Sequence, residues 1–270
     1  MNNALKANVV THLRFCARNR LVLVFGLLVA GITTLSVLPS FFILSKNSRF
    51  DIVLSLFSTI GGFMTGLLGL IALLLVWYHR NQRCVKLVFT KPCTPETWVL
   101  SHYLTGMVLY LGGIAFTLVL TVGLMGVWDL PWQWGLLPAV LWQFLGVASL
   151  FSGLLMLSTV MHPILALFVL LVFSDRLFYQ LVVLCRAGAE SAGTLGAGTL
   201  LYGLEKLCLG LYLILPGGHL FGERLSRLTT GFRMPAEDGL YLLGDTAYTA
   251  LFVLLMYMLT VLALKKQRQV

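Results

Sequence analysis

Long apolar stretches dominate this chain, and short polar stretches separate them. A helix needs about 20 consecutive apolar residues to cross the hydrocarbon core of a lipid bilayer. Five stretches clearly reach this length and therefore predict membrane-spanning helices. They are Leu21–Leu44, Ile52–Tyr78, Trp98–Val127, Leu136–Val160 and Leu240–Leu264.

Two further apolar stretches contain polar residues. The stretch Pro163–Leu184 is interrupted at residues 174–176, and we expect it to cross as another span. The stretch Gly196–Leu215 has Glu205 and Lys206 near its middle. Its leucines recur at helical spacing, which favours a surface helix, a re-entrant hairpin or a buried helix that does not cross.

The composition fits a membrane protein and excludes several other classes. Of the 270 residues, 59% are hydrophobic and 11% are charged, whereas soluble domains carry roughly 25% charged residues. So few charges cannot cover the surface of a soluble enzyme, a disordered regulator or a nucleic-acid-binding domain. The net charge of +9 must be interpreted by position, because cytoplasmic loops of membrane proteins collect Lys and Arg.

Basic residues gather in three segments, in which Glu96 is the one acid. They are Lys6, Arg14, Arg18 and Arg20, then Arg80, Arg83, Lys86 and Lys91, and finally Lys265, Lys266 and Arg268. If all three segments are cytoplasmic, the two termini share a side and the number of spans is even. We therefore predict an all-α integral membrane fold with six spans, both termini cytoplasmic, and an extracytoplasmic helical or re-entrant segment over residues 185–237. The predicted spans cover about residues 21–44, 52–78, 98–127, 136–160, 163–184 and 240–264.

Residues 1–20 have the pattern of an amphipathic helix. Leu5, Val9 and Leu13 share one helical face with Cys16, whereas Arg14 lies elsewhere on the helix. This pattern predicts an interfacial elbow helix in the inner leaflet before the first span. Two roles are open for this helix. It is either a topology anchor alone, or an elbow helix that also contacts a cytoplasmic partner.

The basic segment 80–97 predicts a second short helix. Val85, Val88 and Phe89 form one apolar face at helical spacing, with Arg83 and Lys86 at its rim. An apolar face in the cytoplasm fits a groove on a partner protein, although it also fits the lipid headgroups.

Three residues of segment 80–97 mark where one helix ends and the next begins. Pro92 ends the short helix. Thr94 can cap the following helix, with Pro95 at its first position.

Ionisable residues inside spans are candidates for a gate or a substrate pathway. Asp175 and Arg176 lie about 18 Å into their span at 1.5 Å per residue, and Asp245 lies near the start of the last span. All three can also be interfacial. Gly62 and Gly66 form a GxxxG pair, which permits close helix packing.

Several motifs of enzymes are absent from the sequence. No phosphate-binding GxxxxGK[ST] loop, HExxH motif or GxSxG elbow occurs, so we expect no catalytic residue and no cofactor in this chain. The cysteines are Cys16, Cys84, Cys93, Cys185 and Cys208. None forms a CxxC pair, which disfavours a metal site, and the last two are candidates for a disulfide in an oxidising compartment.

Three parts of the sequence carry a resemblance to a known family. They are LRFCARNRLVLVFGLLVAG at residues 13–31, VKLVFTKPCTPETWVLSHYLTGMVLYLG at Val85–Gly112 and LYLILPGGHLF at Leu211–Phe221. Together they resemble the membrane-spanning permease subunit of type-2, exporter-like ABC transporters. Thr90–Thr94 and Trp98 match the family loosely, and His102 stands where the family often has Lys.

The resemblance implies that residues 1–270 form a single transmembrane permease domain. Two such subunits, identical or different, would each bind a separate cytoplasmic ABC ATPase, which holds ATP and Mg. The helix Arg80–Phe89 would act as the coupling helix, and residues 185–237 would form a gate or bind an extracytoplasmic partner. The expected location is the bacterial inner membrane, and the substrate is unidentified.

Two other functions remain open from the sequence. One is a membrane scaffold or assembly factor that recruits a partner through its outer loop and transports nothing. The other is a secondary transporter, which needs ion-binding residues near the midplane, where only Asp175 is a candidate.

Overall fold

The computed structural model describes residues 3–20, 94–131, 136–172, 175–192, 197–214 and 236–269, together with isolated positions between residues 23 and 74. Across these residues the elements are α-helices and there is no β-strand, so the predicted all-α fold class is confirmed for them. The helices are α1 (Asn3–Arg18), α5 (Pro95–Val127), α6 (Leu136–Val160), α7 (Pro163–Val172), α8 (Asp175–Ala192), α9 (Ala197–Ile214) and α11 (Ala236–Gln269).

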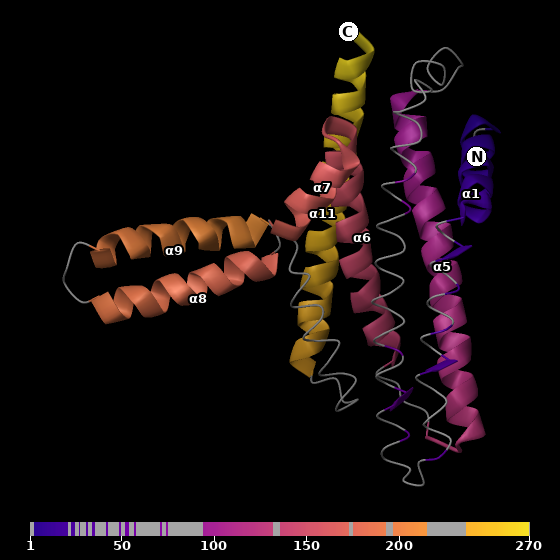
Figure 1. Ribbon diagram of the computed structural model, residues 1–270, viewed down its shortest axis with the longest axis horizontal. Coiled ribbons are helices and arrows are strands. Elements are labelled where there is room, and N and C mark those ends of the chain that lie inside the picture. The colour runs from indigo at the N-terminus through magenta and orange to yellow at the C-terminus, as the bar shows by residue number, and fades with distance from the viewer. Residues whose placement is uncertain are drawn as a thin grey trace.

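Three long helices form the main bundle. Figure 1 shows α5, α6 and α11 side by side, with both marked chain ends toward the same end of the bundle. The segments Pro95–Val127, Leu137–Val160 and Leu240–Lys266 are long and apolar enough to cross a membrane, and they coincide with three of the predicted spans. The predicted spans 21–44 and 52–78 lie outside the described residues except at isolated positions.

The bundle has the polarity of a protein that is solvated by lipid. Large apolar side chains point outward, as Val119 of α5 and Leu251 of α11 do at 73% and 66% exposure. Buried positions include hydroxyl side chains such as Thr105, Thr117 and Ser152. A soluble protein has the opposite arrangement, and helix interfaces in membranes are enriched in such small polar residues.

Most of the described buried Ser and Thr hydroxyls are satisfied within their own helices, Thr249 of α11 being an exception. Thr105 Oγ1 donates to the carbonyl of Ser101 at 2.7 Å, and Ser158 Oγ donates to that of Leu154 at 2.6 Å. The same bond to the residue three or four positions earlier occurs in each long helix. Hydroxyl groups bonded in this way need no water, which suits them to a bilayer.

Local signals fix both ends of α5. Thr94 caps the helix by accepting a hydrogen bond from Thr97 N at 3.3 Å, and Pro95 occupies the first turn, as predicted. The far end closes in a Schellman motif, in which Leu130 N donates to Met125 O at 2.9 Å. Asp129 provides the left-handed residue of this motif with φ 52°.

The predicted span 163–184 differs from the observed structure. The turn after α6 is as expected, and α7 then starts at Pro163, but it ends at Val172. Its 10 residues reach about 15 Å, half of the thickness of the hydrocarbon core. Asp175 begins the separate helix α8.

Helices α8 and α9 form an antiparallel hairpin. Figure 1 shows that it projects to one side of the bundle, roughly perpendicular to the long helices. Both helices bury side chains at alternating steps of four and three residues, the repeat of a coiled-coil seam. The seam consists of the buried Phe178, Val182, Cys185 and Ala189 of α8, the buried Glu205 and Cys208 of α9, and the half-buried Leu201 and Tyr212 of α9.

A close approach of α5 and α6 depends on one glycine. A Cβ atom on Gly106 would lie 2.8 Å from the Phe151 ring, and that ring also contacts Tyr103 edge-on. A Cβ on Gly112, two turns along α5, would meet nothing within 4 Å in the described structure.

We expect Gly106→Ala to destabilise the protein by about 1–3 kcal/mol, because the added methyl overpacks the α5–α6 contact. Gly112→Ala is the matched control and should be neutral or slightly stabilising, since Ala favours helix more than Gly does. Thermal unfolding of the purified chain in detergent measures both. Equal melting temperatures for the two variants would show that Gly106 does not lie against Phe151 of α6.

Candidate functional site

The first turns of α5, residues 95–106, contact three other helices. Helix α1 lies against one side of them, and the last turns of α6 and α11 lie against another. We call this region the junction. Both chain ends lie toward this end of the bundle (Figure 1).

Two buried histidines join α1 to α5. The rings of His12 and His102 lie 4.3 Å apart between centroids, and the His102 ring lies 4.0 Å from that of Trp98. His102 Nδ1 is 2.9 Å from the carbonyl oxygen of Trp98 one turn earlier. Both histidines are at most 3% exposed, so they form part of the packing between the two helices.

The rest of the predicted elbow face also turns inward. Leu5 is buried, whereas Val9 and Leu13 are half-buried and Arg14 is exposed. Cys16 is buried in a cluster with Phe15, Ile71 and Leu109. The amphipathic pattern therefore identifies the face that packs, whereas a position of α1 in the membrane interface remains a prediction.

The other side of the junction holds α11 against α5 and α6. Lys265 of α11 forms an ion pair with Glu96 of α5. Beneath this pair lies an apolar cluster formed by Trp98, Val99, Phe151, Leu155, Val261 and Leu264. Because both members of the ion pair are about half exposed, the cluster supplies most of the attachment.

Asp245 lies near the opposite end of the bundle. Trp142 Nε1 of α6 donates a hydrogen bond to Asp245 Oδ2 of α11 at 3.1 Å. The indole is fully buried with Met125 and Trp128 among its neighbours. The carboxylate thus fixes the α6–α11 contact at this end, and its predicted role in a gate or pathway stays a prediction.

Of the remaining predicted site residues, two lie on a helix that the structure describes. Asp175 and Arg176 stand in the first turn of α8, away from the middle of a continuous span. Coupling-helix residues Arg83, Val85, Lys86, Val88 and Phe89 lie outside the described residues, as do Gly62 and Gly66.

A second ion pair lies in the α8–α9 seam. Arg186 Nη2 donates to Glu205 Oε1 at 2.9 Å, and Arg186 Nε contacts the same oxygen at 3.2 Å. Glu205 is 2% exposed and Arg186 is 60% exposed. Removing the arginine would leave a buried carboxylate unpaired, which typically costs about 3–5 kcal/mol.

Sequence reasoning missed the histidine pair, although the signal is present. His12 lies seven residues after Leu5 and four before Cys16, on the same helical face. His102 follows Trp98 by four residues, which places them on one face of α5. Each histidine is a polar residue on an otherwise apolar helical face, and this pattern indicates a buried contact between helices.

In the portion of the chain that the structure describes, no group of three or more His, Cys, Asp or Glu side chains is arranged to hold a metal ion. Cys185 and Cys208 are buried free thiols in the hairpin seam, so they are not paired in this structure. Comparison of the chain with family models, with curated proteins and with solved structures gave no match.

The packing of α1 has a consequence for Cys16. Burial raises the pKa of this thiol from an ordinary 9.0 to about 11. Since the thiolate is the reactive form, its fraction below pH 9 should be about 100-fold lower than for an ordinary thiol. The rate of alkylation at Cys16 should keep rising tenfold per pH unit between pH 9 and pH 10.

Alkylation by N-ethylmaleimide, followed by mass spectrometry of the peptide that contains residue 16, measures this rate. The control is Ala17→Cys in a chain with Cys16→Ala, because residue 17 is exposed on the same helix. Its rate should level off near pH 9. Matching profiles for the two positions would show that α1 is not packed against α5.

Proposed function

We propose that this chain is the membrane-spanning permease subunit of a type-2, exporter-like ABC transporter. Two such subunits work with separate cytoplasmic ATPases and move an unidentified substrate. Three helices long and apolar enough to cross a bilayer support a membrane protein. The resemblance of Val85–Gly112 to the family supports the class of transporter.

The observation that carries the proposal is the position of the junction in the chain. The predicted coupling helix, Arg80–Phe89, is followed by Pro92, and α5 begins at Pro95, directly after its cap Thr94. Only the five residues 90–94 therefore separate the two helices. A force on the coupling helix therefore enters α5 at its first turn. From there the junction transmits it to α1, α6 and α11.

The chemistry that drives transport belongs to the partner in this proposal. The sequence has no phosphate-binding loop, so ATP and Mg are held by the ATPase. The permease contributes the apolar face of Val85, Val88 and Phe89, which inserts into a groove on the ATPase. Helix α1 rests on the junction and moves with α5 when the ATPases close.

A membrane scaffold is the second candidate. The observation that favours it is the hairpin α8–α9, which projects from the bundle as a separate surface (Figure 1). A scaffold needs no ATPase. Recovery of an ATPase with the tagged chain from native membranes therefore separates the two functions.

The coupling helix provides the sharper test. Apolar anchors at the centre of an interface typically cost about 2 kcal/mol or more when they are removed, whereas rim charges cost little. Val88→Asp and Phe89→Asp should therefore release the ATPase or uncouple its hydrolysis from transport. Lys86→Ala is the control and should retain both.

The measurement is the amount of ATPase recovered per tagged permease and its hydrolysis rate. All three variants should insert into the membrane normally, because none of these residues lies in a predicted span. If Phe89→Asp retains full assembly and coupled hydrolysis, the helix does not contact the ATPase and the proposed coupling site is wrong.

A further inference from the structure

The hairpin α8–α9 meets the bundle at one of its two ends. We call this end, where α8 begins and α9 ends, the root of the hairpin. Figure 1 shows the root beside α7 and α11, whereas the opposite end points away from the bundle. In the part of the chain that the structure describes, the two helices pack chiefly on each other rather than on α5, α6 or α11. The angle between the hairpin and the bundle therefore depends on contacts at the root.

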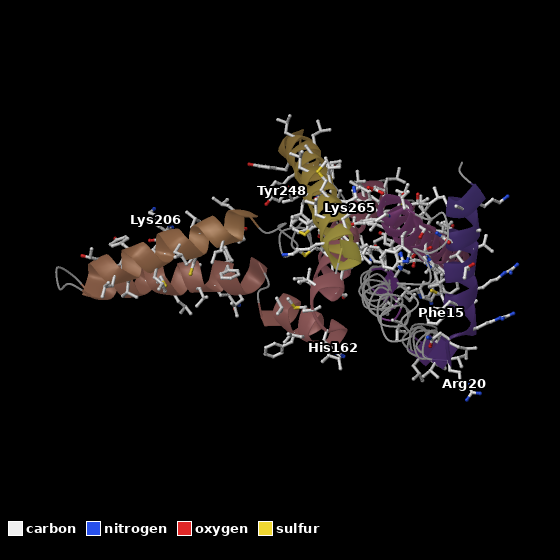
Figure 2. The ribbon with its side chains drawn as sticks, turned by 90° about the horizontal axis from the view of Figure 1, so that it is seen from above. Phe15, Arg20, His162, Lys206, Tyr248 and Lys265 are labelled. Atoms are coloured by element: carbon white, nitrogen blue, oxygen red, sulfur yellow. The ribbon has the colours of Figure 1, made fainter. Side chains whose placement is uncertain are left out.

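A hydrogen bond joins the root to α11. Tyr248 Oη donates to the backbone carbonyl oxygen of Leu213 at 2.6 Å. Leu213 lies in the last turn of α9, which ends at Ile214, and the last four carbonyls of a helix have no amide partner within that helix. In Figure 2, Tyr248 lies on the side of α11 that faces the root. A side chain of α11 thus bonds to a backbone group that α9 itself leaves available.

Contacts across the seam hold α8 and α9 together as one unit. Arg186 and Glu205 form an ion pair across the seam at 2.9 Å. Nearer the root, the rings of Tyr179 and Tyr212 lie 5.8 Å apart between centroids. Because α9 has 18 residues, it is about 27 Å long. A small rotation at the root therefore becomes a larger displacement at the far end of the hairpin.

The second attachment at the root is the connection from α7 to α8. Helix α7 ends at Val172 and α8 begins at Asp175, so this connection is short. A short connection to α8 fixes where the hairpin is attached, but by itself it allows the hairpin to rotate. The Tyr248 bond adds an attachment on α9, and two separate attachments restrict that rotation.

We propose that Tyr248 is the positioning residue that sets the angle of the hairpin α8–α9 to the bundle. Helix α11 runs without a break from Tyr248 to Lys265 in the junction, so a tilt of α11 reaches the hairpin through this bond. Tyr248 also lies inside the segment Leu240–Lys266, which is long and apolar enough to cross a membrane. Within a bilayer no water competes for the Leu213 carbonyl. The proposal needs no ATPase, and it applies to a permease and to a scaffold alike.

Distances between pairs of spin labels test this role. The labels are nitroxides coupled to p-acetylphenylalanine, which leaves the native cysteines unchanged. One pair, at Leu200 and Leu262, joins the far end of the hairpin to α11, and the other, at Leu177 and Leu200, lies within the hairpin. All three positions are exposed. Double electron–electron resonance on the full chain in lipid nanodiscs, diluted with unlabelled chain, measures both distance distributions.

We expect Tyr248→Phe, which removes only the hydroxyl, to broaden the Leu200–Leu262 distribution several-fold and to leave the Leu177–Leu200 distribution unchanged. Tyr202→Phe is the matched control, because Tyr202 is exposed on α9, and it should change neither distribution. An unchanged Leu200–Leu262 distribution in Tyr248→Phe, or equal broadening in the control, would overturn the proposal. Broadening of the Leu177–Leu200 distribution in Tyr248→Phe would show that the hairpin is not one unit, and would overturn it as well.

Discussion

Polar groups in the long helices of this protein must find hydrogen-bond partners without water. The hydroxyls of Thr105, Thr117 and Ser158 meet this constraint by donating to carbonyls of their own helices. Because these bonds satisfy the hydroxyls without water, leucine and valine can cover the outside while small residues pack inside. The inverted polarity of α5, α6 and α11, and their suitability as spans, both follow from this constraint.

Two polar contacts between described helices lie toward opposite ends of the bundle. At one end, Lys265 and Glu96 join α11 to α5, next to the histidine pair that joins α1 to α5. At the other end, Trp142 bonds to Asp245.

The sequence predicted the long helices well because their signal is strong and local. The limits of α6 match the predicted span, and Thr94 and Pro95 begin α5 as the capping pattern indicated. Over residues 163–184 the structure has two helices, α7 and the first part of α8, so the predicted single span there stays a prediction. The pairing of α8 with α9 and of His12 with His102 depends on tertiary packing, which spacing along one segment does not contain.

We propose that ATP hydrolysis by a separate subunit drives transport by this chain. The most direct test of this proposal is the vanadate-sensitive ATPase activity of the complex that a tagged chain recovers from native membranes, measured after reconstitution in lipid. The account predicts hydrolysis that copurifies with the chain and changes when the permease is removed from its ATPase. Recovery of the folded chain with no ATP-hydrolysing subunit would contradict it.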